Sequence, residues 1–556
     1  MNKLIRLGFI GALLLSGAQA LNAQSAMDAF QFAQPDMKGT ARFMSMGGAF
    51  GALGADLTVL NQNPGGIGVY RSSEVGFTLD LDAQSSTALS QGLKTKCDQT
   101  KFYLNNIGGV ITMRTNGVLK NFNIGFTYNK TASFNRRYKG AVPHLGNSLS
   151  NYIAGIANSN DITIADLTPT SSYDPYNPTD GGFVAPWITI LGYDSKLIAP
   201  YQEATTEKTL WSGQWGSNTQ GTGSFDVEEK GAMNEFNIAL GGNFNNVFYW
   251  GMDFGIINFD YKQRSYWAED LKNAYVDLGD GIGTYDSYWK LGNSYHVSGT
   301  GFNYKLGFIV KPVQEFRIGF AFHTPTWYSL SESYIGSVRY DYPGMSNIAY
   351  TNSGYTGESD FDFRTPWRLI ASLAGVIGNR FILSADYEWA NYANMKYSES
   401  DDNYYYDDYY DPWDPWFSPQ RTDYFDPQNS DVKTYYKAQN TLRVGAEFRV
   451  TSGFSLRAGY SYVSSPVEKK AKDGEVPVYT AGTRCSYAFD NITNYITAGF
   501  GYRYRGFSID MAYVFKHRSS EFHAYPSDIA ASSLPSPTAK ITSDNNQVIL
   551  SMAYRF

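Results

Sequence analysis

Residues 441–463 read TLRVGAEFRVTSGFSLRAGYSYV, two alternating runs joined by a short turn. In the first run the apolar residues share one face and the charged residues share the other: Leu442, Val444, Ala446 and Phe448 against Arg443, Glu447 and Arg449. Successive side chains of a strand point to opposite faces, so that residues two apart lie on the same side. The stretch therefore predicts two antiparallel strands with one apolar face each.

The same alternation recurs along the chain, for example in RFILSADYEW (380–389), FSIDMAYVF (507–515) and QVILSMAYRF (547–556). Such runs predict fourteen strands, with boundaries uncertain by two to four residues. We expect them near residues 74–83, 101–114, 121–134, 233–244, 247–262, 294–310, 315–331, 364–377, 380–395, 434–450, 453–464, 492–504, 507–517 and 544–556.

The connections between these strands alternate in length. Short links, such as Asn116-Gly117, Asn245-Asn246 and Arg505-Gly506, are followed by long ones at 135–232, 263–293, 332–363, 396–433, 465–491 and 518–543. An outer-membrane barrel has this layout, with an even strand number, tight periplasmic turns and long external loops. A β-sandwich also has alternating strands but needs no such alternation of its links. We therefore predict an all-β, fourteen-stranded antiparallel transmembrane barrel over residues 74–556, with both termini periplasmic.

The chain begins like an exported protein. Lys3 and Arg6 precede a short apolar stretch, and small residues offer cleavage after Ala20 or Ala23, so residues 1–23 are expected to be a signal peptide. The net charge of −7 argues against a nucleic-acid partner. An aromatic share of 16% with 54 glycines suits a barrel with aromatic girdles in the outer membrane of a Gram-negative bacterium.

Residues 24–73 precede the first strand and are rich in small residues, including Gly47 and Gly48. A lumen of fourteen strands is too wide for its own side chains to fill, so this segment is predicted to be a plug inside the barrel. The alternative is a disordered tail. In the Asn63-Pro64-Gly65-Gly66 turn, proline fixes one φ and the glycines are free to take positive φ, which lets the plug fold back within the lumen.

Four stretches resemble the FadL family of outer-membrane transporters for long-chain fatty acids and other hydrophobic compounds. They are GTARFMSMGGAFGALGADLTVLNQNPGGIG (39–68), IGFAFHTPTW (318–327), LSADYEW (383–389) and QNTLRVGAEFRVTSGFSLRAGYSYVSSPV (439–467). The family's plug carries Asn-Pro-Ala, and here Asn63-Pro64 is followed by Gly65. The resemblance implies that external loops capture a hydrophobic molecule, that the plug shifts, and that the ligand leaves sideways into the membrane through a gap beside a distorted third strand. Gly125 lies in the predicted third strand and is the candidate for that distortion.

The long segment 135–232 contains a predicted helix in NSLSNYIAGIAN and the apolar stretch FVAPWITILGYDSKLIAPY. Two interpretations remain open. Trp187, Ile188, Ile190 and Leu191 either form an exposed apolar surface that captures ligand, or pack on one another as a lid.

Residues 401–427 are acidic and aromatic and are expected to form an external loop. Their aspartates match no EF-hand spacing, and no metal site or cofactor is predicted. Cys97 and Cys485, the only cysteines, lie in predicted loops on the same side and either pair or stay free.

The charged residues on inward faces have mixed sign and are expected to pair with one another and with the plug: Asp386, Glu388, Arg443, Glu447, Arg449, Arg457, Arg503 and Asp510. No serine, histidine and carboxylate come together in the pattern, so no catalytic residues and no enzyme are predicted. We expect passive uptake of a hydrophobic small molecule. The alternatives are a surface receptor, for hemin or another ligand, and a subunit of a protein-secretion system. The expected partners are that molecule, outer-membrane lipid and, through the C-terminal Phe556, the barrel-assembly machinery.

Overall fold

The computed structural model describes residues 24–178, 184–202, 209–378, 380–400, 425–529, 532–533 and 536–556. The predicted signal peptide and residues 401–424 of the acidic aromatic loop lie outside these ranges. Among the described residues, no helix is both long enough and apolar enough to cross a membrane.

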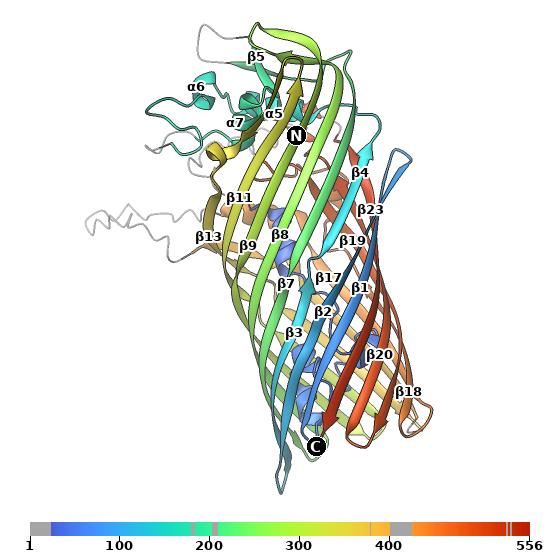
Figure 1. The fold of residues 1–556 in the computed structure, drawn as a ribbon. Coiled ribbons are helices and arrows are strands. Elements are labelled where there is room, and N and C mark those ends of the chain that lie inside the picture. The colour runs from blue at the N-terminus through green and yellow to red at the C-terminus, as the bar shows by residue number, and fades with distance from the viewer. Residues whose placement is uncertain are drawn as a thin grey trace, which may run out of the picture.

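One antiparallel sheet closes on itself to form a barrel (Figure 1). The sheet contains nineteen strand segments. Four strands of the barrel are each interrupted and so consist of two consecutive segments, and β12 only forms a hairpin with β11, so the barrel has the fourteen strands predicted. Closure is made by pairing of the first and last strands, from Glu74 with Arg555 to Leu89 with Lys540. In chain order the segments are β1 (Glu74–Ser90), β2 (Leu93–Arg114), β3 (Leu119–Ser133) with β4 (Arg136–Val142), β7 (Gln220–Phe244), β8 (Phe248–Asp277), β9 (Ile282–Val313), β10 (Phe316–His323) with β11 (Trp327–Tyr342), β12 (Met345–Tyr350), β13 (Gly357–Arg364) with β14 (Arg368–Ile377), β15 (Phe381–Asn391) with β16 (Lys396–Glu399), β17 (Ala438–Arg449), β18 (Phe454–Val463), β19 (Tyr487–Tyr504), β20 (Phe507–His523) and β23 (Thr538–Arg555).

Several strands run further than predicted at the end opposite the short turns. The expected loop 263–293 is mostly a hairpin, because β8 continues to Asp277 and β9 starts at Ile282. In this extension of β8 the outward residues, such as Lys262 and Arg264, are charged and exposed, so it lacks the outward apolar face by which the first part of the strand was predicted. Prediction by apolar alternation therefore ended these strands too early.

Two predicted strands are interrupted at neighbouring prolines. The strand expected at 315–331 breaks at Pro325, between β10 and β11, and the one expected at 364–377 starts earlier and breaks at Pro366, between β13 and β14. Proline cannot donate a ladder hydrogen bond. The side chain and backbone of Thr365 bridge the two breaks, accepting from Thr326 N at 2.8 Å and donating to Thr326 O at 3.0 Å.

Outward-facing apolar side chains form a band around the short-turn half of the barrel. It includes Phe102, Ile107, Phe126, Phe236, Ile256, Phe320, Leu383, Phe448, Ile496 and Tyr513, all of them exposed. Such a band matches the hydrocarbon layer that a transmembrane barrel requires. On β8 it ends near Ile256, beyond which Asn258, Asp260 and Lys262 face outward.

Residues 24–72 lie inside the ring of strands, as helices α2 (Ala26–Ala33), α3 (Ala41–Ser45), α4 (Val59–Gln62) and η3 (Pro64–Val69). Most of their side chains are buried, and they form hydrogen bonds with strands on opposite sides of the barrel, from β9 to β23. Gln24, the first described residue, is buried in the half with the long loops, whereas Phe556 ends the chain beside the short turns (Figure 1). The first described residue and Phe556 therefore lie at opposite ends of the barrel, and the periplasmic location of both termini stays a prediction.

The helices of the long connection form a cap over the opposite end of the barrel: α5 (Leu149–Ser159), α6 (Ile164–Leu167) and α7 (Trp187–Asp194), with the small hairpin of β5 (Ile198–Gln202) and β6 (Leu210–Gly213). Two further helices, α8 (Asp426–Tyr435) and α9 (Lys469–Lys472), belong to later connections, which also include the two-residue pair β21 (Asp528–Ile529) and β22 (Ser532–Ser533) and the turns η4 (Thr351–Gly354) and η5 (Tyr392–Asn394).

Candidate functional site

The Asn63 side chain fixes the turn that opens η3. Its amide nitrogen donates to Gly51 O at 2.6 Å and to Phe308 O of β9 at 3.3 Å, and its carbonyl oxygen accepts from Gly65 N at 3.0 Å. Asn63 is fully buried. Pro64 occupies the first position of the 3-10 helix, where no N–H is needed.

Gly65 and Gly66 are not at positive φ, so the expected reason for these glycines is wrong. They are needed for space. A Cβ on Gly65 would lie 2.9 Å from the backbone of Gly307, and a Cβ on Gly66 would lie 2.6 Å from the Val59 side chain. The barrel wall also has a glycine at this contact: a Cβ on Gly251 of β8 would lie 2.0 Å from Pro64 O. Backbone therefore rests directly on backbone where η3 meets β8 and β9.

Gly47 and Gly48 make a second contact of this kind, on the opposite wall. Both have positive φ, 63° and 74°, which only glycine adopts readily. A Cβ on Gly47 would lie 2.8 Å from Tyr460 N of β18, and one on Gly459 would lie 2.2 Å from Gly47 N. Gly47 N also donates to the Thr497 hydroxyl at 3.0 Å. The luminal segment is thus held on two sides of the barrel by paired glycines.

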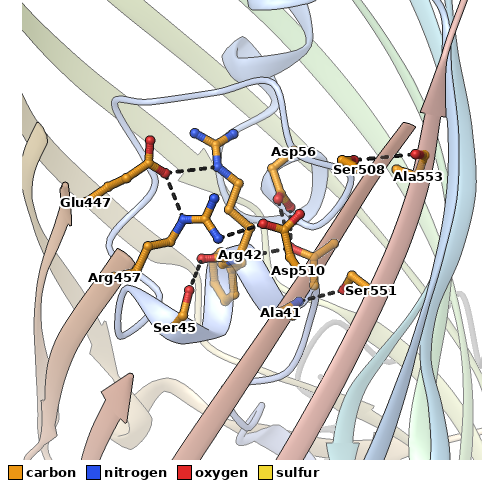
Figure 2. Close-up of polar contacts among 12 residues, drawn as sticks. Ala41, Arg42, Ser45, Asp56, Glu447, Arg457, Ser508, Asp510, Ser551 and Ala553 are labelled. Atoms are coloured by element: carbon orange, nitrogen blue, oxygen red, sulfur yellow. Dashed lines mark hydrogen bonds and ion pairs between the residues drawn. The ribbon is translucent and has the colours of Figure 1, made fainter. Parts of the chain in front are cut away.

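Most of the inward charged residues pair as predicted, and the luminal segment joins them (Figure 2). Arg503 differs: it is exposed and forms no ion pair among the described residues. Glu447 accepts from Arg457 at 2.8 Å and from Arg42 of α3 at 3.4 Å, and Arg457 reaches Asp510 at 2.6 Å. Arg443 donates to Glu388 at 2.7 Å. On the other side of the segment, Asp386 accepts from Phe50 N at 2.9 Å and Gly51 N at 3.0 Å.

Gly125 is not where the third strand is distorted. It pairs in register with Val110 of β2 and Ala239 of β7, so the ladder around it is intact. A Cβ there would lie 2.8 Å from Leu60 of the luminal segment. Gly125 is therefore another contact between wall and segment, and its assignment to the gap is corrected.

The regular pairing of the third strand ends a few residues beyond Gly125. Pairing of β2 with β3 stops at Asn106 with Asn129, and the register of β3 on β7 shifts between Lys130 and Ala132. Beyond this bulge β4 pairs with β7, while residues 93–104 of β2 pair only with β1. Within the described residues, no ladder joins β2 to β4, although the two strands lie close together, so the hydrogen bonding of the wall is broken here.

The break lies at the edge of the apolar band. On β2 the exposed residues beside it are Phe102, at 66% exposure, and Leu104, whereas Lys96 and Asp98 follow toward the long loops. A surface hollow of about 560 Å³ adjoins the bulge and is lined by residues that include Lys130, Asn135, Asn234 and Asp260.

The luminal segment contacts the bulge directly. Asp36 N donates to Thr131 O at 2.8 Å. Thr131 is the residue of the bulge that has no partner residue on β7. The Asp36 carboxylate pairs with Lys516 of β20 at 2.8 Å, and Lys38 pairs with Asp80 of β1 at 2.8 Å. Two ion pairs thus hold the one stretch of the segment that lies at the break.

Trp187, Ile188, Ile190 and Leu191 belong to α7 and are 0–3% exposed. They pack in the apolar core of the cap, together with Ile153 of α5 and Ile198 of β5. The structure thus favours the lid and not an exposed capture surface. Cys97 and Cys485 are free thiols. No group of three or more potential metal ligands occurs in the described part of the chain.

Sequence reasoning missed Thr131 and Asp36. The register shift leaves no trace in the alternation, because even-numbered aromatic residues face outward before it, as Tyr128 does, and inward after it, as Phe134 and Tyr138 do.

Comparison with known proteins agrees with this geometry. Residues 288–556 match the model of a family described as outer membrane protein transport protein (OMPP1/FadL/TodX). The chain is similar in structure to a FadL homologue of Pseudomonas aeruginosa, with 12% identity, coverage of 94% of this chain and 100% of that one, and a TM-score of 0.50. It is also similar to the toluene transporters TodX of P. putida and TbuX of Ralstonia pickettii, each at 12% identity over 94% of this chain and 99% of theirs, with TM-scores of 0.46 and 0.44. No curated protein matches.

Proposed function

Since this chain belongs, over residues 288–556, to the FadL/TodX family of outer-membrane transport proteins, we propose that it admits hydrophobic small molecules, such as long-chain fatty acids, by passive diffusion. The observation that carries the proposal is the break between β2 and β4, with the luminal segment bonded to its edge through Asp36 and Thr131. The short turns and Phe556 then face the periplasm, and Phe556 is the residue offered to the barrel-assembly machinery.

The proposed route leads from the capped end of the barrel to the break. Transfer of apolar surface from water to hydrocarbon is favourable by roughly 25 cal/mol per Å². A hydrophobic molecule therefore gains more by leaving sideways, past Phe102 and Leu104, than by crossing the polar mouth beside Arg457 and Asp510. The luminal segment fills the barrel along this route, so transport requires it to shift.

A pair of disulfide variants tests that requirement. Ala41 N lies 2.7 Å from the Ser551 hydroxyl, so A41C/S551C would tether α3 to β23. The matched control is T78C/S551C, whose parent hydroxyls also lie 2.7 Å apart but join two neighbouring strands. Both are made with Cys97 and Cys485 replaced by serine.

Uptake of a radiolabelled long-chain fatty acid and of a monoaromatic hydrocarbon is measured before and after reduction. We expect the tether to block uptake until reductant is added, while the control transports throughout. Equal uptake by both oxidised variants would contradict movement of the segment, and failure of the parent to take up either probe would contradict transport. Mass spectrometry of organic extracts from the purified protein, with an unrelated barrel as control, identifies the cargo class.

A further inference from the structure

Gln24 carries a polar side chain in a place where nothing satisfies it. The residue is 1% exposed, and neither its amide nitrogen nor its amide oxygen has a hydrogen-bond partner among the described residues. A buried polar group without a partner destabilises the folded protein. The adjoining residues are well held by contrast, since Tyr397 donates to Ser25 O at 3.1 Å and Ser25 N donates to Asp28 at 2.9 Å.

The surroundings of Gln24 are also unfavourable to positive charge. Ser25 is the N-cap of α2, so Gln24 lies at the positive end of the helix dipole. The nearest carboxylate of that helix, Asp28, is already engaged by Ser25 and by the Arg484 guanidinium. A free α-ammonium at Gln24 would be a buried charge without a dedicated partner, which is strongly disfavoured.

We propose that cleavage of the signal peptide after Ala23 makes Gln24 the first residue and that it cyclises to pyroglutamate before the barrel closes around it. The α-nitrogen attacks Cδ of the side-chain amide. A bond forms between the α-nitrogen and Cδ, the bond between Cδ and Nε2 breaks, and Nε2 leaves as ammonia with the proton that the α-nitrogen loses. The step is redox-neutral and needs no co-reactant.

Cyclisation removes the charge and the unpartnered amide nitrogen. The lactam carries no charge, and it keeps one N–H and one carbonyl in place of an ammonium and a primary amide. A compact neutral ring is easier to bury at this position than an ammonium group is. The modification would therefore help to seat the whole luminal segment.

The test is the mass of the N-terminal peptide. Protein purified from outer membranes is treated with an amine-labelling reagent before digestion, and a synthetic peptide that begins with glutamine is carried through the procedure to measure cyclisation caused by handling. We expect a peptide that starts at residue 24, is lighter than the glutamine form by one ammonia, and carries no label. A labelled Gln24, or a peptide that starts at Leu21, would overturn the proposal.

The variant Gln24→Asn supplies a second measurement, since asparagine would have to close a strained four-membered ring. We expect it to keep a labelled amine and to lose much of the protease protection of residues 24–38. Equal protection in parent and variant would show that the ring does not seat the segment. An unlabelled, cyclised parent supports the modification even if the variant fails to assemble.

Discussion

The guanidinium of Arg484 donates to both carboxylate oxygens of Asp28, at 2.6 and 3.0 Å, and so joins the connection between β18 and β19 to helix α2 inside the barrel. The Asp28 side chain is buried and the Arg484 side chain is only 10% exposed, and the guanidinium carbon lies 4.0 Å from the centre of the Tyr295 ring. One ion pair thus links a connection at the long-loop end of the barrel to the luminal segment.

Replacing Arg484 with glutamine should release α2. Removal of one partner from a buried ion pair leaves the other charge unpaired and costs about 3–5 kcal/mol. We expect residues 24–38 to become accessible to protease in R484Q while the barrel stays intact. The double variant R484Q/D28N should recover part of the protection, because neither charge then remains. Unchanged protection in R484Q would show that the pair does not hold the helix.

The paired glycines should be intolerant of a single methyl group. In G251A the new Cβ would meet Pro64 O at 2.0 Å, and in G307A it would meet Asn63 Oδ1 at 2.0 Å, so η3 must move off the wall. The control is G375A, where the nearest atom is 3.9 Å away. We expect the first two variants to admit a small polar antibiotic several-fold faster than the control. Equal permeability of all three would contradict seating of η3 by these glycines.

Asn63→Ala should loosen the segment without affecting the barrel. It removes the hydrogen bonds to Gly51 O and Phe308 O and the acceptor of Gly65 N, at a cost of about 1–3 kcal/mol for each buried group left without a partner. We expect uptake to change in N63A, and more so in N63A/P64A, while both proteins still show the heat-dependent gel mobility of a folded barrel. Loss of the barrel itself would contradict this assignment.

Deleting Thr131 should close the break in the wall. The shift between Lys130 and Ala132 is one residue, so its removal lets β3 continue in phase into β4, at the cost of the hydrogen bond from Asp36. We expect a folded barrel with little uptake of hydrophobic probes. The variant Asp36→Asn, which keeps the backbone bond but weakens the pairing with Lys516, should retain the break and transport. Normal uptake after the deletion would exclude the break as the exit.

The cap should be more stable in acid than in base. Glu269 lies on the part of β8 beyond the apolar band, is fully buried, and accepts from Leu149 N of α5 at 2.9 Å and from Trp267 at 2.7 Å. Burial raises the pKa of Glu269 from 4.5 to about 7, so the folded cap holds a proton that the unfolded chain releases earlier. Cap stability is then full at low pH, falls as pH rises between these values, and levels off above about 7.

Limited proteolysis of residues 145–215 at about pH 5 and about pH 8 checks this dependence. The parent should be cut faster at the higher pH, and E269Q, which stays neutral, should be cut at similar rates at both. An equal dependence in the two proteins would assign it to another group.

The strand pattern was predictable because lipid on one side and a filled lumen on the other impose a strict alternation. In β17, for example, Leu442, Val444 and Phe448 face outward, whereas Arg443 and Glu447 form ion pairs inside. The luminal segment was predictable from its small residues. The positions at which the segment contacts the wall could not be predicted. Gly65 and Gly251 lie far apart in sequence, and the need for glycine at both positions is apparent only when the structure places them next to each other. The register shift at Thr131 falls where the aromatic residues pass from the outer face to the inner face, so the alternation along the sequence continues unbroken and does not reveal the shift.

The ladder between β1 and β23 has a consequence for biogenesis. Glu74 and Arg555 are 481 positions apart, so the seam that closes the barrel can form only after the whole chain has been exported. Contacts between such distant residues form slowly, because their loop-closure entropy is lost before they contribute stability. Residues 24–72 immediately precede one edge of that seam and fit between walls that allow no spare methyl group. We therefore expect them to be in place before the seam forms, so that the luminal segment serves as a template around which the barrel is completed.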